Sequence, residues 1–205
     1  MRPVDIWRGA FGRDYTSRNP CTPEEAEALY VKKYGVTRTD MNNEFVGDLP
    51  RDIRILEVGC NVGVQLVLLN KMGFKHLYGI DVQLIKRADC FAFKLAPAQS
   101  IPFKDNYFDL VFTSGLLIHI PEIDKPQVVS EICRVTKRYV WGFEYDSPTR
   151  RMISYQGQDD LLWADDYVAW FRDRRGFREV KEKLYPYITE EEKGKMDSMY
   201  LVEKI

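Results

Sequence analysis

Apolar residues in the middle of this chain follow two alternating patterns, which predict strands and helices in turn. Short β-branched or apolar runs bounded by turn residues predict strands at 53–58, 76–80, 106–113 and 138–143. Between them, the spacing typical of helices occurs at 64–72 and 125–135. A strand, a tight turn and a helix in that order form the first half of a βαβ unit, so the repeated alternation predicts a parallel, doubly wound α/β sheet.

The last third of the chain has a different pattern. A helix at about 164–174 precedes two strands, 177–188 and 199–205, which a charged loop joins without an intervening helix. Consecutive strands without a crossover helix pair antiparallel, so we expect a hairpin at one sheet edge. A short strand at 91–95 is ambiguous, because its spacing also suits the end of a helix over 82–93. With that strand, the prediction is a mostly parallel, Rossmann-like seven-stranded sheet with an antiparallel edge hairpin, which resembles the architecture of class I methyltransferases.

The first 50 residues lie ahead of the predicted sheet, and we expect them to cover one end of it. Residues 6–19 are rich in aromatic and polar side chains but show no regular period, which predicts an irregular arm. Thr22 to Glu25 is a capping box with proline at the first helical position, so a helix should begin there and end at Gly35. A second short helix is expected at about 40–46. Packing without ligand contact is the alternative role for this N-terminal helical arm.

Composition fits one globular domain of 205 residues. Hydrophobic residues make up 45% and charged residues 30%, which excludes a disordered chain. The net charge of −1 gives no electrostatic footprint for nucleic acid, and no apolar run approaches the roughly 20 residues of a membrane span. Four scattered cysteines indicate free thiols in a reducing cytoplasm, and two histidines without grouped carboxylates predict no dedicated metal site.

Candidate chemistry begins at the turn after the first strand, Glu57-Val-Gly59-Cys-Asn61-Val-Gly63. Such a turn brings backbone N–H groups and a helix N-terminus close to a ligand. Dinucleotide sites hold a pyrophosphate here, and the Glu57 carboxylate would repel that anion. A ligand with an amino group and a sulfonium is instead attracted, so the turn favours S-adenosylmethionine over NAD.

Asp81 stands at the tip of the second predicted strand, about 20 residues after the glycine turn. A carboxylate can accept hydrogen bonds from two ribose hydroxyls at once, which fits the nucleoside of the same cofactor. The alternative role is the N-cap of a helix over 82–93. We predict the ribose role, because the turn and the acid independently indicate one ligand.

Class I methyltransferases share the glycine turn and the acid after the second strand. Over further segments, the chain more closely resembles one class I family, the pseudaminic acid biosynthesis-associated methylases. The likeness spans nearly the whole chain. The resembling segments are Trp7-Arg-Gly-Ala-Phe11-Gly-Arg-Asp-Tyr15-Thr-Ser-Arg18-Asn19, Leu-Glu-Val-Gly-Cys-Asn at 56–61, Gly-Leu-Leu-Ile-His-Ile at 115–120, Glu144-Tyr145, and the stretch 155–163.

This resemblance implies a cytoplasmic S-adenosylmethionine-dependent methyltransferase encoded with nonulosonate-sugar pathways. Its acceptor would be a sugar or sugar-acid precursor of a bacterial surface glycan, methylated on O or N. One domain (1–205) would combine the arm (1–50) with a sheet core (51–205) that carries an acceptor-side insertion (147–175). The expected partner is a small-molecule acceptor, not nucleic acid or a membrane, and the protein would be a monomer or homodimer. Alternatives are another small metabolite as acceptor, or a catalytically silent cofactor-binding module.

Two positions depart from the general class I pattern. Pro97 stands where an acid often binds the adenine amine, so the Ala98 backbone and the Gln99 amide are the expected replacements. Asn61 occupies the place of a third glycine, and asparagine tolerates a left-handed backbone conformation better than most residues. We therefore expect cofactor binding to be retained.

Methyl transfer to a hydroxyl needs an aligned acceptor and a group that removes its proton. His119 is the first candidate base, because it follows the fourth strand where the sheet edge meets the cofactor and titrates in a useful range. Packing against the adenosine or capping a helix is its alternative role. Glu144 and Tyr145 end the fifth strand on the same rim, and they are either further catalytic candidates or ordinary surface residues.

The arm and the later loops complete the expected site. Tyr15 and Arg18 would close over the cofactor and pair with its carboxylate. The expected cofactor-binding residues are Tyr15, Arg18, Glu57, Gly59, Cys60, Asn61, Gly63, Asp81, Val82, Ala98, Gln99, Ser114 and Leu116. The expected substrate-binding residues are Trp7, Phe11, His119, Tyr145, Tyr155 and Trp163.

Overall fold

Seven strands form one sheet in the order β3-β2-β1-β4-β5-β9-β8. The computed structural model describes residues 3–19, 22–85, 88–157 and 159–205. β1 to β5 are parallel, whereas β9 runs antiparallel to both β5 and β8. The strands are β1 (Arg54–Val58), β2 (His76–Asp81), β3 (Ala92–Leu95), β4 (Phe108–Ser114), β5 (Thr136–Tyr145), β8 (Phe177–Pro186) and β9 (Met196–Lys204). The predicted mostly parallel sheet with an antiparallel edge hairpin is confirmed.

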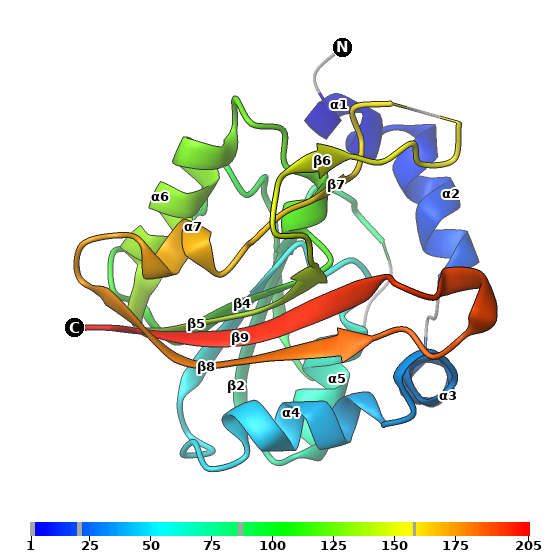
Figure 1. Cartoon of the computed structure of the whole chain (residues 1–205). Coiled ribbons are helices and arrows are strands. Elements are labelled where there is room, and N and C mark those ends of the chain that lie inside the picture. Colours follow the sequence, from blue (N-terminus) through cyan, green and yellow to red (C-terminus); the bar gives the residue numbers. More distant parts are fainter. Residues whose placement is uncertain (1–2, 20–21, 86–87, 158) are drawn as a thin grey trace.

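Helices cover both faces of this sheet (Figure 1). α4 (Arg38–Val46) and α5 (Val64–Lys71) lie on one face, and α6 (Lys125–Val135) and α7 (Ala169–Arg172) lie on the other. The apolar face of α6 is formed by Val128, Ile132 and Val135, at the spacing that places side chains on one side of a helix. Because both faces are covered, the central strands are apolar on both sides, as buried parallel strands are.

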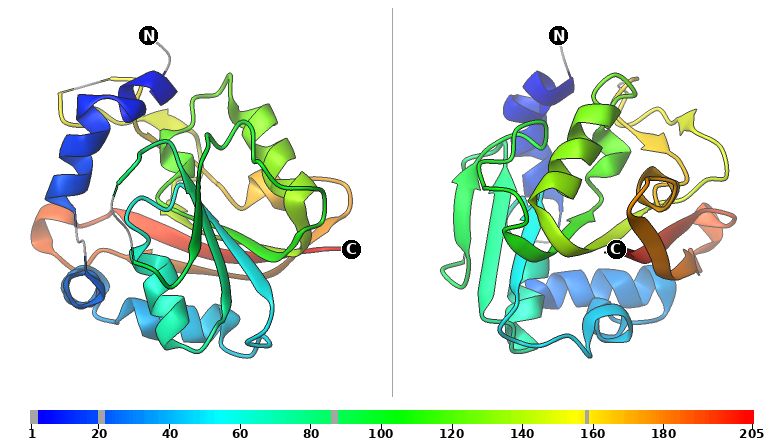
Figure 2. Two further views of the ribbon diagram at one scale, coloured as in Figure 1. Left: turned by 180° about the vertical axis from the view of Figure 1, so that it is seen from behind. Right: turned by 90° about the vertical axis from the view of Figure 1, so that its left-hand side faces the viewer.

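The N-terminal segment is helical, not irregular as its sequence suggested. α1 (Pro3–Arg8) and α2 (Ala10–Arg18) meet at Gly9 and stand at one end of the strands (Figures 1 and 2). Trp7, Phe11 and Tyr15 are four residues apart, and the Trp7 ring packs edge-to-face on both others at centroid distances of 5.2 Å. That spacing is a helical signal, which the polar residues between the rings concealed.

The next two helices follow the sequence prediction closely. α3 (Pro23–Tyr34) begins with the capping box, in which Thr22 Oγ1 accepts from Glu25 N at 3.2 Å and Glu25 Oε2 accepts from Thr22 N at 3.1 Å. α4 begins at residue 38 rather than about 40, because the Thr37 side chain caps it by accepting from Asp40 N at 3.0 Å.

Two further helix predictions are wrong. No helix forms in the described residues 82–85 and 88–91, since the Asp81 carboxylate accepts from Gln83 N and turns the chain toward β3. The helix expected at 164–174 is reduced to α7, because β7 (Trp163–Ala164) pairs with β6 (Arg151–Met152). Seven residues that the predictions covered lie outside the described residues, namely Met1, Arg2, Pro20, Cys21, Lys86, Arg87 and Gln158.

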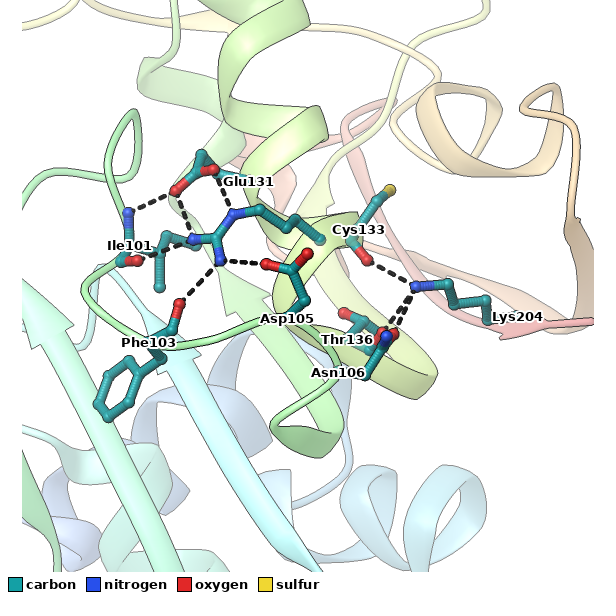
Figure 3. Close-up of polar contacts among 9 residues, drawn as sticks. Ile101, Phe103, Asp105, Asn106, Glu131, Cys133, Thr136 and Lys204 are labelled. Atoms are coloured by element: carbon teal, nitrogen blue, oxygen red, sulfur yellow. Dashed lines mark hydrogen bonds and ion pairs between the residues drawn. The ribbon is translucent and has the colours of Figure 1, made fainter.

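The loop between β3 and β4 is held by one arginine of α6. Arg134 donates to the carbonyl oxygens of Ile101 and Phe103 at 2.9 and 2.8 Å. Glu131, one helical turn earlier, accepts from Ile101 N at 2.7 Å (Figure 3). These contacts fix the loop just after Ala98, which faces the site described next.

Candidate functional site

A cavity of about 270 Å³ lies where the carboxyl ends of β1, β2 and β4 meet the N-terminal helices. Ligands of open α/β sheets bind at this edge, because parallel strands present their carboxyl ends together there. The predicted site residues that line it are Trp7, Tyr15, Glu57, Gly59, Cys60, Asn61, Asp81, Val82, Ala98, Gln99, Ser114, Leu116 and His119. The predicted residues that do not line it are Phe11, Arg18, Gly63, Glu144, Tyr145, Tyr155 and Trp163.

The glycine turn has the left-handed backbone that its sequence requires. Gly59 and Gly63 have φ angles of 77° and 82°, and Asn61 adopts φ 47°. A Cβ at position 59 would stand 2.7 Å from Leu116 Cδ1, so only glycine fits beneath the loop that follows β4. Gly63 does not itself face the cavity but occupies the N-cap of α5.

Asp81 binds the backbone on both sides of the cavity. Its Oδ2 accepts from Asn61 N and its Oδ1 accepts from Gln83 N, each at 2.8 Å. Each carboxylate oxygen has two lone pairs, so these bonds leave acceptor capacity for ribose hydroxyls. The alternative N-cap role does not apply, because no helix follows in the described residues 82–85.

Glu57 provides an acidic group at the floor of the cavity. Its residue is only 3% exposed, and Oε2 has no hydrogen-bond partner. Burial raises the pKa of Glu57 well above its usual range; the Arg38 charge opposes this shift and the Asp81 charge adds to it. An orphaned buried carboxyl fits a ligand that brings a positive charge, as the amino group and sulfonium of S-adenosylmethionine do.

The N-terminal arm is fastened over the cavity by two side chains that the sequence analysis missed. The Gln83 Nε2 group donates to Trp7 O, and also to Gly9 O at 3.4 Å. The Thr16 hydroxyl donates to Asn61 Oδ1 at 3.1 Å. Gln83 and Asn61 both donate a backbone N–H to Asp81, so the arm is held by the same residues that support the predicted ribose site.

His119 ends the short helix η1 (Leu117–His119) and is only 8% exposed. Its Nδ1 lies 2.6 Å from Leu161 O, and a carbonyl can only accept, so Nδ1 carries the proton and Nε2 keeps its lone pair. Burial lowers the pKa of His119 to about 4, and the Leu161 hydrogen bond only partly opposes this. The imidazole is therefore neutral at physiological pH.

Aromatic rings surround this imidazole. The Trp7 ring lies 4.3 Å from it by centroids, and the rings of Tyr155 and Tyr15 lie at 5.9 and 6.2 Å. Phe11 packs on Tyr155 at 6.3 Å. The structure thus brings Trp7, Tyr15, Tyr155 and His119 together, with Phe11 behind Tyr155.

The predicted catalytic positions of Glu144 and Tyr145 need correction, because neither side chain reaches the cavity. Glu144 is 1% exposed, and its two carboxyl oxygens accept from Leu116 N and Ile118 N at 3.2 and 3.3 Å. It therefore supports the loop that carries His119. The Tyr145 ring stacks instead on Tyr187, at a centroid distance of 6.2 Å.

Two other predicted residues lie away from the cavity. Arg18 is exposed at the end of α2. Trp163 is buried in β7, where the Arg150 guanidinium covers its ring at 5.1 Å. Arg150 also pairs with Asp165 at 3.1 Å within the segment 147–175, and it donates to Ile120 O at 2.8 Å, which connects the segment to the rest of the fold. The acceptor-side role of that segment stays a prediction.

α3 and α4 also contribute to the site, although no motif in their sequence indicates it. Tyr30 of α3 lines the cavity, and the fully buried Arg38 of α4 donates to Tyr30 Oη at 2.7 Å. An arginine near a helix N-terminus gives no sequence signal of burial, since most arginines are exposed.

Membrane and metal sites were sought among the residues that the structure describes. No helix in that part of the chain is both long and apolar enough to cross a bilayer. Within the same residues, no group of three or more His, Cys, Asp or Glu side chains is arranged to hold a metal ion.

Comparison with known proteins agrees with this geometry. Residues 56–141 match the family model described as Methyltransferase domain. Among solved structures, the chain is similar to 1,6-didemethyltoxoflavin-N1-methyltransferase of Burkholderia thailandensis with bound S-adenosylhomocysteine (TM-score 0.70, 14% identity, 100% of this chain and 91% of that chain). It is also similar to an S-adenosylmethionine-dependent methyltransferase of Leishmania major (TM-score 0.69, 18% identity, 98% of this chain and 86% of that chain). At these identities the likeness shows the fold alone, which is the predicted Rossmann-like methyltransferase fold.

One curated relative is an uncharacterized protein of Haemophilus influenzae, 29% identical over 103 residues. The match covers 44% of this chain and 41% of the relative, so the chain spans less than half of that protein's length. The matched methyltransferase domain and the fold together support S-adenosylmethionine as the cofactor. The resemblance to the pseudaminic acid-associated family is not confirmed by these comparisons.

Proposed function

We propose that this protein transfers a methyl group from S-adenosylmethionine to a small polar acceptor. The observation that carries the proposal is the buried Glu57, whose Oε2 has no partner, beside Asp81 in a cavity lined in part by the matched residues 56–141. An acid at each of these strand ends suits the amino group and the ribose of one ligand.

The chain supplies a base and aromatic side chains that exclude water from the reaction. The bound cofactor would supply a methyl group already activated by its sulfonium. His119 Nε2, unprotonated and at the cavity wall, is placed to accept the proton of an acceptor hydroxyl as the new C–O bond forms. Trp7 and Tyr15 exclude water from this end of the cavity. The products are a methylated acceptor and S-adenosylhomocysteine.

For the acceptor, the finer proposal is a sugar or sugar-acid precursor of a bacterial surface glycan, made in the cytoplasm. It rests on the sequence resemblance and on the aromatic rings around His119, since a pyranose ring can stack on an indole or phenol face. Methylation of another small metabolite is the alternative. A panel of nucleotide-linked and free sugars and of amino acids, scored by release of S-adenosylhomocysteine, distinguishes them. Turnover confined to non-sugar acceptors would contradict the finer proposal.

Binding of the cofactor is the first test. Titration calorimetry with S-adenosylhomocysteine should give a Kd in the micromolar range or below. Failure to bind either S-adenosylhomocysteine or S-adenosylmethionine would overturn the proposal. Binding without turnover across a broad acceptor panel would favour a catalytically silent cofactor-binding module.

A further inference from the structure

Arg38 is a buried cation without an anionic partner. It is 0% exposed, and it donates to Asn42 Oδ1 at 2.8 Å, Tyr30 Oη at 2.7 Å and Ser114 Oγ at 3.2 Å. These acceptors are all neutral, and Nη2 has no hydrogen-bond partner. Among the described residues no ion pair involves this guanidinium, although the charges of Glu57 and Asp197 act on it from a longer distance. A buried charge without a close counter-charge is unfavourable, so an anion bound nearby would stabilise it.

Two hydroxyl groups lie between the guanidinium and the cavity. Tyr30 of α3 and Ser114 at the end of β4 both line the cavity, and Arg38 stands behind them. A guanidinium can only donate, so both hydroxyl oxygens accept from Arg38. Tyr30 and Ser114 also hydrogen-bond each other, with the serine hydroxyl donating to the phenol oxygen. The Tyr30 proton therefore stays available to a ligand in the cavity. Burial raises the pKa of Tyr30, against the opposing Arg38 charge, so its hydroxyl is an O–H donor at neutral pH. The pair therefore offers the cavity a hydroxyl donor with a positive charge behind it.

Glu57 lines the same cavity and is close enough to Arg38 for that charge to act on its pKa. A ligand with an ammonium and a carboxylate on neighbouring atoms would satisfy both residues. Its ammonium would neutralise Glu57, and its carboxylate would neutralise Arg38. An α-amino acid group has this pair of charges, and the proposed cofactor carries one at its methionyl end.

We propose that Tyr30 and Ser114, backed by Arg38, form the subsite for the α-carboxylate of the cofactor, while Glu57 binds its α-amine. Tyr30 donates a hydrogen bond to the carboxylate, the Ser114 hydroxyl orients Tyr30 by donating to its oxygen, and Arg38 is a positioning residue that holds both hydroxyls and supplies the positive charge. The proposal rests on the proposed function. It places the carboxylate beside α3, in place of the exposed Arg18 that the sequence suggested.

Three ligands distinguish the contribution of the carboxylate to binding from that of the amine. S-adenosylhomocysteine has the amine and the carboxylate, its decarboxylated analogue lacks only the carboxylate, and 5′-methylthioadenosine lacks both. Tyr30→Phe should raise the Kd of S-adenosylhomocysteine by about 10- to 100-fold, the value of a hydrogen bond to a charged group. The same change should leave the Kd of the other two ligands within about twofold. Glu57→Gln should raise the Kd of both amine-bearing ligands and leave the Kd of 5′-methylthioadenosine unchanged.

Tyr34→Phe is the matched control. Tyr34 lies one turn later on α3, its hydroxyl donates to Asp197, and it does not line the cavity. It should leave all three Kd values unchanged. If Tyr30→Phe raised the Kd of all three ligands equally while keeping the wild-type circular dichroism spectrum, the carboxylate subsite would be overturned and the proposed function would stay intact. Failure of the wild-type protein to bind S-adenosylhomocysteine would overturn the proposed function itself.

Arg38→Lys and Arg38→Met test the positioning role. The lysine variant keeps the charge and should recover part of the S-adenosylhomocysteine affinity that the methionine variant loses. Equal affinity in both variants would remove Arg38 from the subsite. Because Arg38 is fully buried, the methionine variant can fail to fold, and Tyr30→Phe then decides the outcome.

Discussion

At the residue scale, His119 is the group whose chemistry depends most on its surroundings. The Leu161 carbonyl fixes the tautomer, and burial keeps the ring neutral, so Nε2 is available as a base. We expect His119→Ala to keep the wild-type Kd for S-adenosylhomocysteine but to cut turnover by roughly 10²–10⁴-fold, the usual contribution of a general base. Calorimetry and a turnover assay check the two parts. Unchanged turnover would remove His119 from that role.

Glu144 gives a second residue-scale prediction, which concerns stability. Burial raises its pKa from 4.5 to about 7, against the hydrogen bonds of Thr113 and of the loop backbone. The folded state therefore takes up a proton more readily than the unfolded state, and the resulting stabilisation is complete below pH 4.5 and is lost as pH rises through about 7. Relative to Glu144→Gln, the wild-type free energy of unfolding should gain on the order of 2 kcal/mol between pH 8 and pH 5. Urea unfolding at the two pH values measures this, and a gain at the higher pH would contradict it.

At the element scale, the contact of α2 with α1 rests on one small residue. A Cβ at Gly12 would overlap Trp7 O and Gln83 Nε2, whereas a Cβ at Gly9 would meet only backbone oxygens at 3.4 and 3.5 Å. We expect Gly12→Ala to lower the free energy of unfolding by about 1–3 kcal/mol through overpacking, and to raise the acceptor KM by displacing Trp7 from His119. Gly9→Ala is the control and should change neither quantity. Similar effects of both substitutions would disprove this account.

The predicted and observed elements differ for reasons that lie outside local sequence. β1 and β4 could be predicted because a run of apolar residues specifies a strand buried on both faces. The segment after Asp81 was predicted as a helix, yet the carboxylate of that residue turns the backbone through a bond to Gln83 N. α1 and α2 were missed because the polar residues between Trp7, Phe11 and Tyr15 concealed the helical spacing of these rings. The contact of Trp7 with His119, more than 100 residues later in the chain, could not be predicted from local sequence.

At the scale of the whole molecule, the candidate site joins parts that fold from separate stretches of the sequence. The glycine turn and Asp81 could be located from the sequence, because their spacing is set by one βαβ unit. The burial of Arg38 and Glu144 could not, since it depends on how α4 and β5 pack in the finished fold. The cavity therefore closes only when the arm, α3 and three strand ends are assembled.

This assembly predicts which segments ligand binding stabilises. Because Asp81 supports both Asn61 and Gln83, which hold the arm, S-adenosylhomocysteine should slow amide hydrogen exchange in α1, α2 and residues 82–85. The hairpin of β8 and β9 includes no residue that lines the cavity, so its exchange should change little and serves as the internal control. Hydrogen exchange followed by mass spectrometry measures all of these segments in one experiment. In Gln83→Ala, the protection of α1 should fall while that of α5 persists. Equal protection of the arm and the hairpin would contradict the link between cofactor and arm.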